Sequence, residues 1–99
     1  MKIDYCHSLL NYKRFETLEV EIGSVLFGGN HPVRVQSMTN TDTKNIDESI
    51  EQSKRIFDAG ADLVRLTIPS VKDIDSLRLI KSGLVKDNYL GPVSADVHF

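Results

Sequence analysis

Leu-Val-Arg-Leu-Thr-Ile, at positions 63–68, is the stretch that decides the fold. Successive side chains of a strand point to opposite faces, so this stretch has an apolar set that can pack under helices: Val64, Leu66 and Ile68. Similar stretches start near Val33 and Val93, at a spacing of 30 residues that matches one strand–helix–strand crossover. We therefore predict parallel strands at 33–38, 63–68 and 93–98, adjacent in that order and joined by right-handed crossovers.

Two amphipathic helices are predicted between these strands. The first has Asn45 as its N-cap, Glu48 in position for a reciprocal bond, and Gly60 at its end. Ser70 is predicted to cap the second, in which apolar residues recur every three to four positions up to Leu84. Alternating strands and helices indicate an α/β fold with a parallel sheet, either doubly wound or closed as a barrel.

A β-hairpin is predicted before the parallel unit. Apolar and acidic residues alternate in 18–22, Gly23 and Ser24 make a turn, and a second short strand spans 25–27. Residues 1–17 have no sustained period and are predicted to form an N-terminal arm, so the domain covers 18–99. The third strand ends the chain with its apolar face uncovered, and we therefore expect a fragment of a longer protein.

Composition argues against several classes of function. The 14 acidic and 12 basic residues include no run of like charges longer than two, so nucleic acid is not an expected partner. Neither a signal peptide nor a membrane span is predicted, and we expect a cytoplasmic protein with no membrane partner. The lone Cys6 can form neither an intrachain disulfide nor a cysteine cluster, so no metal ligands are expected in this chain.

Polar side chains on the second and third strands are the candidate site. In the third strand, an apolar set alternates with a polar set, Ser94, Asp96 and His98. In the second strand, Arg65 alternates with apolar residues in the same way. Polar groups near the C-terminal ends of barrel strands commonly form active sites. Arg65 offers a planar fork for phosphate oxygens, which Asp96 or His98 could orient. Alternatively, Arg65 and Asp96 form a structural ion pair and His98 is a hydrogen-bonded core residue.

A polar run follows the first strand and is a second candidate: Gln36, Ser37, Met38, Thr39 and Asn40. On spacing alone, such a run is equally an ordinary loop with capping residues. Gly28 and Gly29 predict a turn, since the Lys-Ser pair of a phosphate loop does not follow them.

Three motifs resemble, in order and spacing, the start of the 4-hydroxy-3-methylbut-2-enyl diphosphate synthase family. They are Gly-Gly-Asn-His-Pro-Val-Arg-Val-Gln-Ser-Met-Thr-Asn-Thr at 28–41, Asp-Ala-Gly-Ala-Asp-Leu-Val-Arg-Leu-Thr at 58–67, and Ser-Ala-Asp-Val-His-Phe at 94–99. The resemblance covers about residues 18–99. It implies the N-terminal part of a TIM (β/α)8 barrel, with a hairpin that plugs the lower end of the barrel. It also implies a C-terminal domain with a 4Fe-4S cluster, which this chain does not contain.

The resemblance further implies an oxidoreductase of isoprenoid biosynthesis, in the methylerythritol phosphate pathway. The family converts 2-C-methyl-D-erythritol 2,4-cyclodiphosphate to 4-hydroxy-3-methylbut-2-enyl diphosphate, using electrons from ferredoxin or flavodoxin. By match to the family, Arg65 holds the substrate diphosphate, Asp96 and His98 line the same barrel mouth, and 36–40 is a substrate-binding signature. We expect the full-length protein to be a homodimer and the isolated fragment to be inactive.

Two alternatives are open, the first another barrel enzyme and the second a protein of another class. A pterin-binding barrel resembling dihydropteroate synthase would use similar residues at the strand ends, but the Val-Gln-Ser-Met-Thr-Asn-Thr run at 35–41 favours the first family. A small non-enzymatic binding module would need a helix to cover its third strand.

Overall fold

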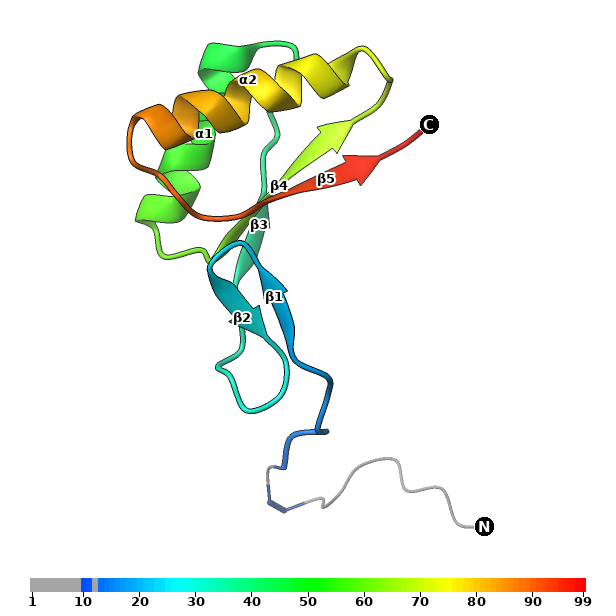
Figure 1. The fold of residues 1–99 in the computed structure, drawn as a ribbon, viewed down its shortest axis with the longest axis vertical. Helices are drawn as coiled ribbons and strands as arrows, with labels where there is room; N and C mark the ends of the chain where they lie inside the picture. Colours follow the sequence, from blue (N-terminus) through cyan, green and yellow to red (C-terminus); the bar gives the residue numbers. More distant parts are fainter. Residues whose placement is uncertain (1–9, 12) are drawn as a thin grey trace.

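Residues 10, 11 and 13–99 are described by the computed structural model of the chain. Within them, β1 (Val20–Ile22) and β2 (Val25–Phe27) form an antiparallel hairpin. A separate parallel sheet has the order β3 (Gln36–Met38), β4 (Leu63–Ile68) and β5 (Val93–Val97). The helices α1 (Ile46–Asp58) and α2 (Asp73–Lys86) connect these strands (Figure 1). The predicted hairpin and the predicted order of parallel strands are therefore confirmed.

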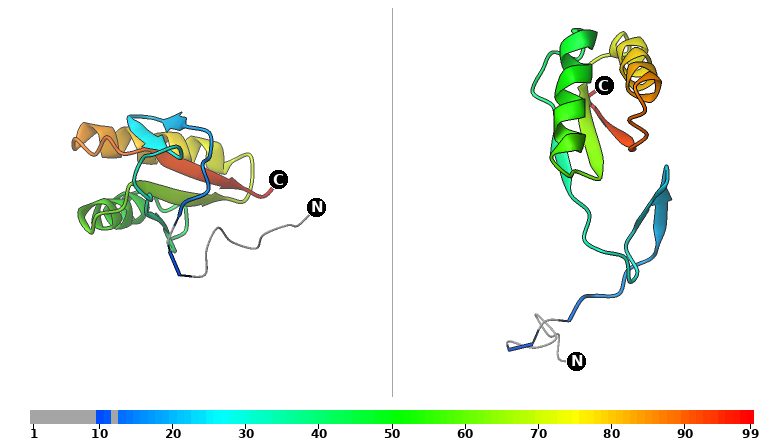
Figure 2. Two further views of the ribbon diagram at one scale, coloured as in Figure 1. Left: turned by 90° about the horizontal axis from the view of Figure 1, so that it is seen from below. Right: turned by 90° about the vertical axis from the view of Figure 1, so that its left-hand side faces the viewer.

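The sheet is open, and the barrel is not closed by the described residues. Both helices cover the same face of the sheet, as the two views in Figure 2 show. The buried centre of the core comprises Leu66 from β4 with Ile80 and Leu84 from α2. Val64 and Ile68 are buried on the same face of β4, as the alternation of the sequence predicts. No helix of the described residues lies on the opposite face of the sheet.

Two element boundaries differ from the prediction. The first parallel strand begins at Gln36, and not near Val33, because Gln36 is already level with the first residue of β4. The carbonyl of Val35 still accepts from the backbone nitrogens of Asp62 and Leu63, at 2.8 and 3.3 Å. Residues further upstream lie beyond Leu63, the first residue of β4.

The second helix begins at Asp73, three residues after the predicted cap. The side chain of Ser70 does not accept a bond from the helix backbone in the described structure, as that of an N-cap would, although the Ser70 carbonyl accepts from the Asp73 backbone nitrogen at 3.0 Å. Instead, its backbone nitrogen and its hydroxyl donate to Oδ2 of Asp73, at 3.2 and 2.8 Å. A turn across 70–73 therefore precedes the helix, and the Asp73 side chain is buried at its start. By contrast, Asn45 caps α1 as predicted and accepts from the Glu48 backbone nitrogen at 3.3 Å.

The hairpin lies at the end of the sheet where the parallel strands begin (Figure 1). Its turn is close to the start of β5, since a Cβ added at Gly23 would lie 3.5 Å from Cβ of Pro92. The Arg34 side chain donates to the carbonyl of Leu26 at 2.8 Å, which ties β2 to the segment before β3. Whether this hairpin plugs a complete barrel stays a prediction.

The predicted N-terminal arm is described only in part. Residues 1–9 and 12, and with them Cys6, lie outside the described residues. Residues 13–17 have no regular secondary structure. The Arg14 side chain donates to the carbonyl of His31 at 2.6 Å, and the Thr17 hydroxyl accepts from the Gly29 backbone nitrogen at 3.2 Å. The end of the arm therefore contacts the loop that follows the hairpin.

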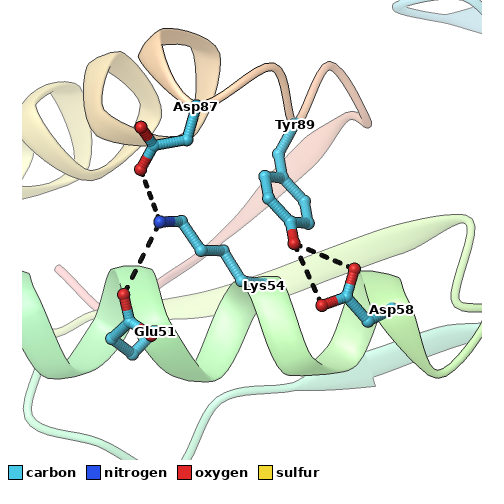
Figure 3. Close-up of polar contacts among 5 residues, drawn as sticks. All are labelled: Glu51, Lys54, Asp58, Asp87 and Tyr89. Carbon is cyan, nitrogen blue, oxygen red and sulfur yellow. Dashed lines mark hydrogen bonds and ion pairs between the residues drawn. The ribbon is translucent and has the colours of Figure 1, made fainter.

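A polar cluster joins α1 to the chain that follows α2 (Figure 3). The ammonium of Lys54 contacts the carboxylates of Asp87 and Glu51, and the Tyr89 hydroxyl donates to Asp58 at 2.9 Å. The hydrogen bond between Lys54 and Asp87 raises the pKa of the lysine and lowers that of the aspartate. The bond to Asp58 likewise raises the pKa of the tyrosine. These contacts orient the two helices toward one another at the end where β5 begins.

Candidate functional site

The helix-free face of the sheet carries the candidate site. Arg65 in β4 is level with Met38 in β3 and with Ser94 in β5. One step further along, Thr67 is level with Asp96. Residues that are level on adjacent parallel strands point to the same face. The helix-free face therefore displays polar side chains toward the C-terminal ends of two neighbouring strands.

Asp96 is the centre of this arrangement. One carboxylate oxygen lies 3.0 Å from Nη2 of Arg65, and the other lies 3.2 Å from Nε2 of His98. The Asp96 side chain is 21% exposed, whereas those of Arg65 and His98 are 41% and 57% exposed. The structure thus contains the ion pair of the structural alternative, but the pair is open to solvent on the arginine side.

The electrostatics keep Asp96 charged. The hydrogen bond from Arg65 is the main cause that lowers the pKa of Asp96, while partial burial opposes this shift and the bond from His98 adds to it. A charged Asp96 holds one edge of the guanidinium, which has five N–H donors in a planar fork. Arg65 consequently has further donors available for an anionic ligand.

The polar run at 36–40, whose first three residues form β3, is divided between the two sides of the sheet. Gln36 and Met38 are on the face of Arg65, because Met38 is level with it and strand side chains alternate. Ser37 instead lines a cavity of about 320 Å³ on the side of α1. The hydroxyl of Thr39 is buried and has no hydrogen-bond partner among the described residues. The side chain of Asn40 is bonded to Gln52 of α1, at 2.6 Å.

Of the predicted site residues, the structure therefore brings five to one face of the sheet: Arg65, Asp96, His98, Gln36 and Met38. Ser37 and Asn40 are directed toward α1. The strand period could indicate the first group, whereas the orientation of Asn40 depends on a helix residue twelve positions away.

Two residues that sequence reasoning missed fix the loop after β3. Gln52 accepts from the backbone nitrogens of Asn40 and Thr41, at 2.9 and 3.3 Å. Thr43 is buried, and its hydroxyl donates to the carbonyl of Thr67 at 2.6 Å. Threonine in a loop after a strand is common, and a polar residue on a helix flank is expected to meet solvent. The sequence therefore contains no signal for either role.

The residues present do not fit an iron–sulfur cluster. Such clusters are held chiefly by cysteine thiolates, and this chain has one cysteine, Cys6. Within 10, 11 and 13–99, no group of three or more His, Cys, Asp or Glu side chains could hold a metal ion.

No helix in the same part of the chain is long and apolar enough to cross a membrane.

Strand–helix units with helices on one face and polar strand ends on the other occur in TIM-type barrel domains. The profile of the GcpE TIM-barrel domain matches residues 17–99. The chain therefore belongs to the GcpE TIM-barrel domain family, as the three motifs indicated.

Curated relatives agree with this assignment. A protein of Bacteroides thetaiotaomicron named 4-hydroxy-3-methylbut-2-en-1-yl diphosphate synthase (flavodoxin) is 52% identical over 91 residues, which cover 92% of this chain. An Arabidopsis thaliana protein, named as the chloroplastic ferredoxin form of the synthase, is 44% identical over 95 residues, or 96% of the chain. The chain spans only 15% and 13% of the lengths of these two relatives.

Proposed function

We propose that this chain forms the first part of the barrel of a 4-hydroxy-3-methylbut-2-en-1-yl diphosphate synthase and supplies residues that bind the substrate diphosphate. The family match and the relatives' names support the activity. The proposal makes the full-length protein an oxidoreductase of isoprenoid biosynthesis, acting on 2-C-methyl-D-erythritol 2,4-cyclodiphosphate. The observation that carries the binding role is Arg65, whose exposed guanidinium lies on the helix-free face.

In this proposal, Arg65 contacts the diphosphate directly. Asp96 holds the guanidinium from one side, so that the remaining N–H donors point to the ligand. His98 is oriented by the same carboxylate and can donate to a phosphate oxygen when it is protonated. Gln36 and Met38 form the adjoining wall, while the rest of the run (Ser37, Thr39 and Asn40) sets the shape of the loop beside the site. One N–H group of Arg65 is paired with the Asp96 carboxylate. The other N–H groups of the guanidinium can donate to the negatively charged oxygens of the diphosphate.

Other parts of the full-length protein complete the reaction. The relatives' names support flavodoxin or ferredoxin as the electron donor. A 4Fe-4S cluster would supply electron transfer, and its ligands belong to segments other than this chain. We also propose that the full-length protein is a homodimer in the cytoplasm.

Substitution of Arg65 in the full-length enzyme tests the binding role. Arg65→Ala should weaken substrate binding by about 10- to 150-fold, the value of a hydrogen bond to a charged group. Arg65→Lys should fall between this variant and the wild type, because lysine keeps the charge but loses the planar fork. Binding can be measured by calorimetry, and turnover with reduced flavodoxin.

Arg78→Ala is the matched control for these variants. Arg78 is on α2, its side chain is 72% exposed, and it pairs only with Asp75 in the described structure. Its replacement should change neither affinity nor turnover. Unchanged affinity in a folded Arg65→Ala protein would remove Arg65 from the site. In that case the ion pair with Asp96 would be structural only.

A further inference from the structure

The loop between β3 and α1 is held by one side chain of the helix. The carboxamide oxygen of Gln52 accepts from the backbone nitrogens of Asn40 and Thr41, at 2.9 and 3.3 Å. Its nitrogen donates to Oδ1 of Asn40 at 2.6 Å. One side chain therefore makes three hydrogen bonds to two consecutive loop residues, and it uses both ends of its amide.

The held residues begin two positions after Met38, the residue of β3 that is level with Arg65. Met38 is level with Arg65, and the backbone nitrogen of Thr39 donates to the Arg65 carbonyl at 3.0 Å. Asn40 is the next residue, at which the chain leaves the sheet. A displacement of Asn40 would also move Met38, the wall residue that is level with Arg65, because only Thr39 lies between them.

Further contacts support the same loop at its other end. The hydroxyls of Thr41 and Ser49 are 2.8 Å apart, and Ser49 also contacts the carbonyl of Asp42 at 3.2 Å. The Thr43 hydroxyl binds the carbonyl of Thr67 in β4. Of these contacts, those of Gln52 hold the loop residues nearest to Met38, which is level with Arg65, and both backbone N–H groups that it binds are directed to α1. These two N–H groups are consequently not available to an anion on the sheet face.

We infer that Gln52 is a positioning residue for diphosphate binding: it fixes the Asn40–Thr41 backbone so that the loop leaves Arg65 accessible and correctly oriented. This inference rests on the proposed function. It assigns Asn40 a role through Gln52, and not a direct contact with the ligand. Gln52 itself does not touch the substrate.

Two replacements of Gln52 in the full-length protein separate its hydrogen bonds from its size. Gln52→Leu removes the acceptor and the donor, whereas Gln52→Glu keeps an acceptor for the two backbone N–H groups. Glu51→Leu is the matched control, because Glu51 is on the same helix and contacts Lys54 instead of the loop. Hydrogen exchange of the 39–45 segment reports on the loop, and calorimetry with inorganic diphosphate and with the cyclic substrate reports on the site.

Gln52→Leu should accelerate exchange in the 39–45 segment and weaken binding of both anions by roughly fivefold or more, the worth of one or more hydrogen bonds. Gln52→Glu should stay closer to the wild type than Gln52→Leu does in both measurements. The control Glu51→Leu should match the wild type. Asn40→Ala combined with Gln52→Leu should bind no more weakly than Gln52→Leu alone.

The outcomes distinguish this inference from the proposed function. If the wild type binds both anions, and Gln52→Leu accelerates exchange without loss of affinity, only the positioning role is overturned. Unchanged exchange in Gln52→Leu also overturns it. If the wild-type protein binds neither anion and has no turnover, the proposed function fails, and the inference fails with it.

Discussion

Replacement of Gly91 by alanine tests the packing between α1 and the segment before β5. A Cβ at this position would lie 2.3 Å from Cε1 and 2.8 Å from Cζ of Phe57. Carbon atoms in contact are about 3.5–4.0 Å apart, so the ring would have to move by more than about 1 Å. Phe57 cannot move freely, because it packs against the buried core and lies beside Tyr89, with ring centroids 6.3 Å apart.

The expected loss of stability is the difference between two effects. Overpacking of this kind costs about 1–3 kcal/mol. Alanine in place of glycine restricts the unfolded chain, which stabilises the folded protein by about 0.4–1 kcal/mol. The packing term is larger, and we expect Gly91→Ala to lower the free energy of unfolding by about 1–2 kcal/mol.

A double-mutant cycle with Phe57→Leu checks the cause of this loss. Leucine leaves room where the ring was, so the double variant should be less destabilised than the sum of the single variants, by about 1 kcal/mol. The free energies can be measured by urea denaturation of the full-length protein. If Gly91→Ala is as stable as the wild type, or if the two losses simply add, the packing argument is wrong.

Three further predictions concern charge, backbone and assembly. Because Arg65 lowers the folded-state pKa of Asp96 below its ordinary value, the contribution of this pair to stability is present above that ordinary value and is lost as the pH falls through the lowered pKa. Arg65→Gln should raise the pKa of Asp96 in a carbon-13 NMR titration, and an unshifted pKa would refute the assignment. Gly60 has φ +105°, and a Cβ added there would have no steric contact within 4 Å, so Gly60→Ala should cost about 1–2 kcal/mol from backbone strain alone. Thermal unfolding that matches the wild type would contradict this. The isolated 99-residue chain should self-associate, because Val97 and Phe99 are 54% and 61% exposed beside an open sheet edge. Sedimentation at several concentrations checks this, and a concentration-independent monomer would count against it.

The strands and the polarity of their faces could be predicted from the sequence, because both depend on a local period. Their order could be predicted from the spacing of 30 residues between strand starts, which matches one crossover. The alternation through 63–68 places Leu66 under the helices and Arg65 on the opposite face. Family motifs then allowed the fold to be identified as part of a barrel, which the three open strands alone do not show.

Features that depend on tertiary contacts could not be predicted. Ser70 has the sequence of a helix cap, but the carboxylate of Asp73 takes up both of its donors and the helix starts later. The family resemblance predicts one signature at 36–40, but strand alternation and Gln52 divide these residues between two sides of the sheet. Long-range bonds such as that of Thr43 to Thr67 leave no periodic trace in the sequence.

The middle position of β4 has a consequence for synthesis on the ribosome. One edge of β4 pairs with β3, which is made earlier, but the other edge has to wait for β5. Residues 69–92 separate the two strands, and at 5–20 residues per second their translation takes roughly one to five seconds. During this interval the chain presents an unpaired strand edge, a row of free backbone N–H and C=O groups. A longer delay between the emergence of β4 and of β5 would therefore give this edge more time to pair with a wrong strand.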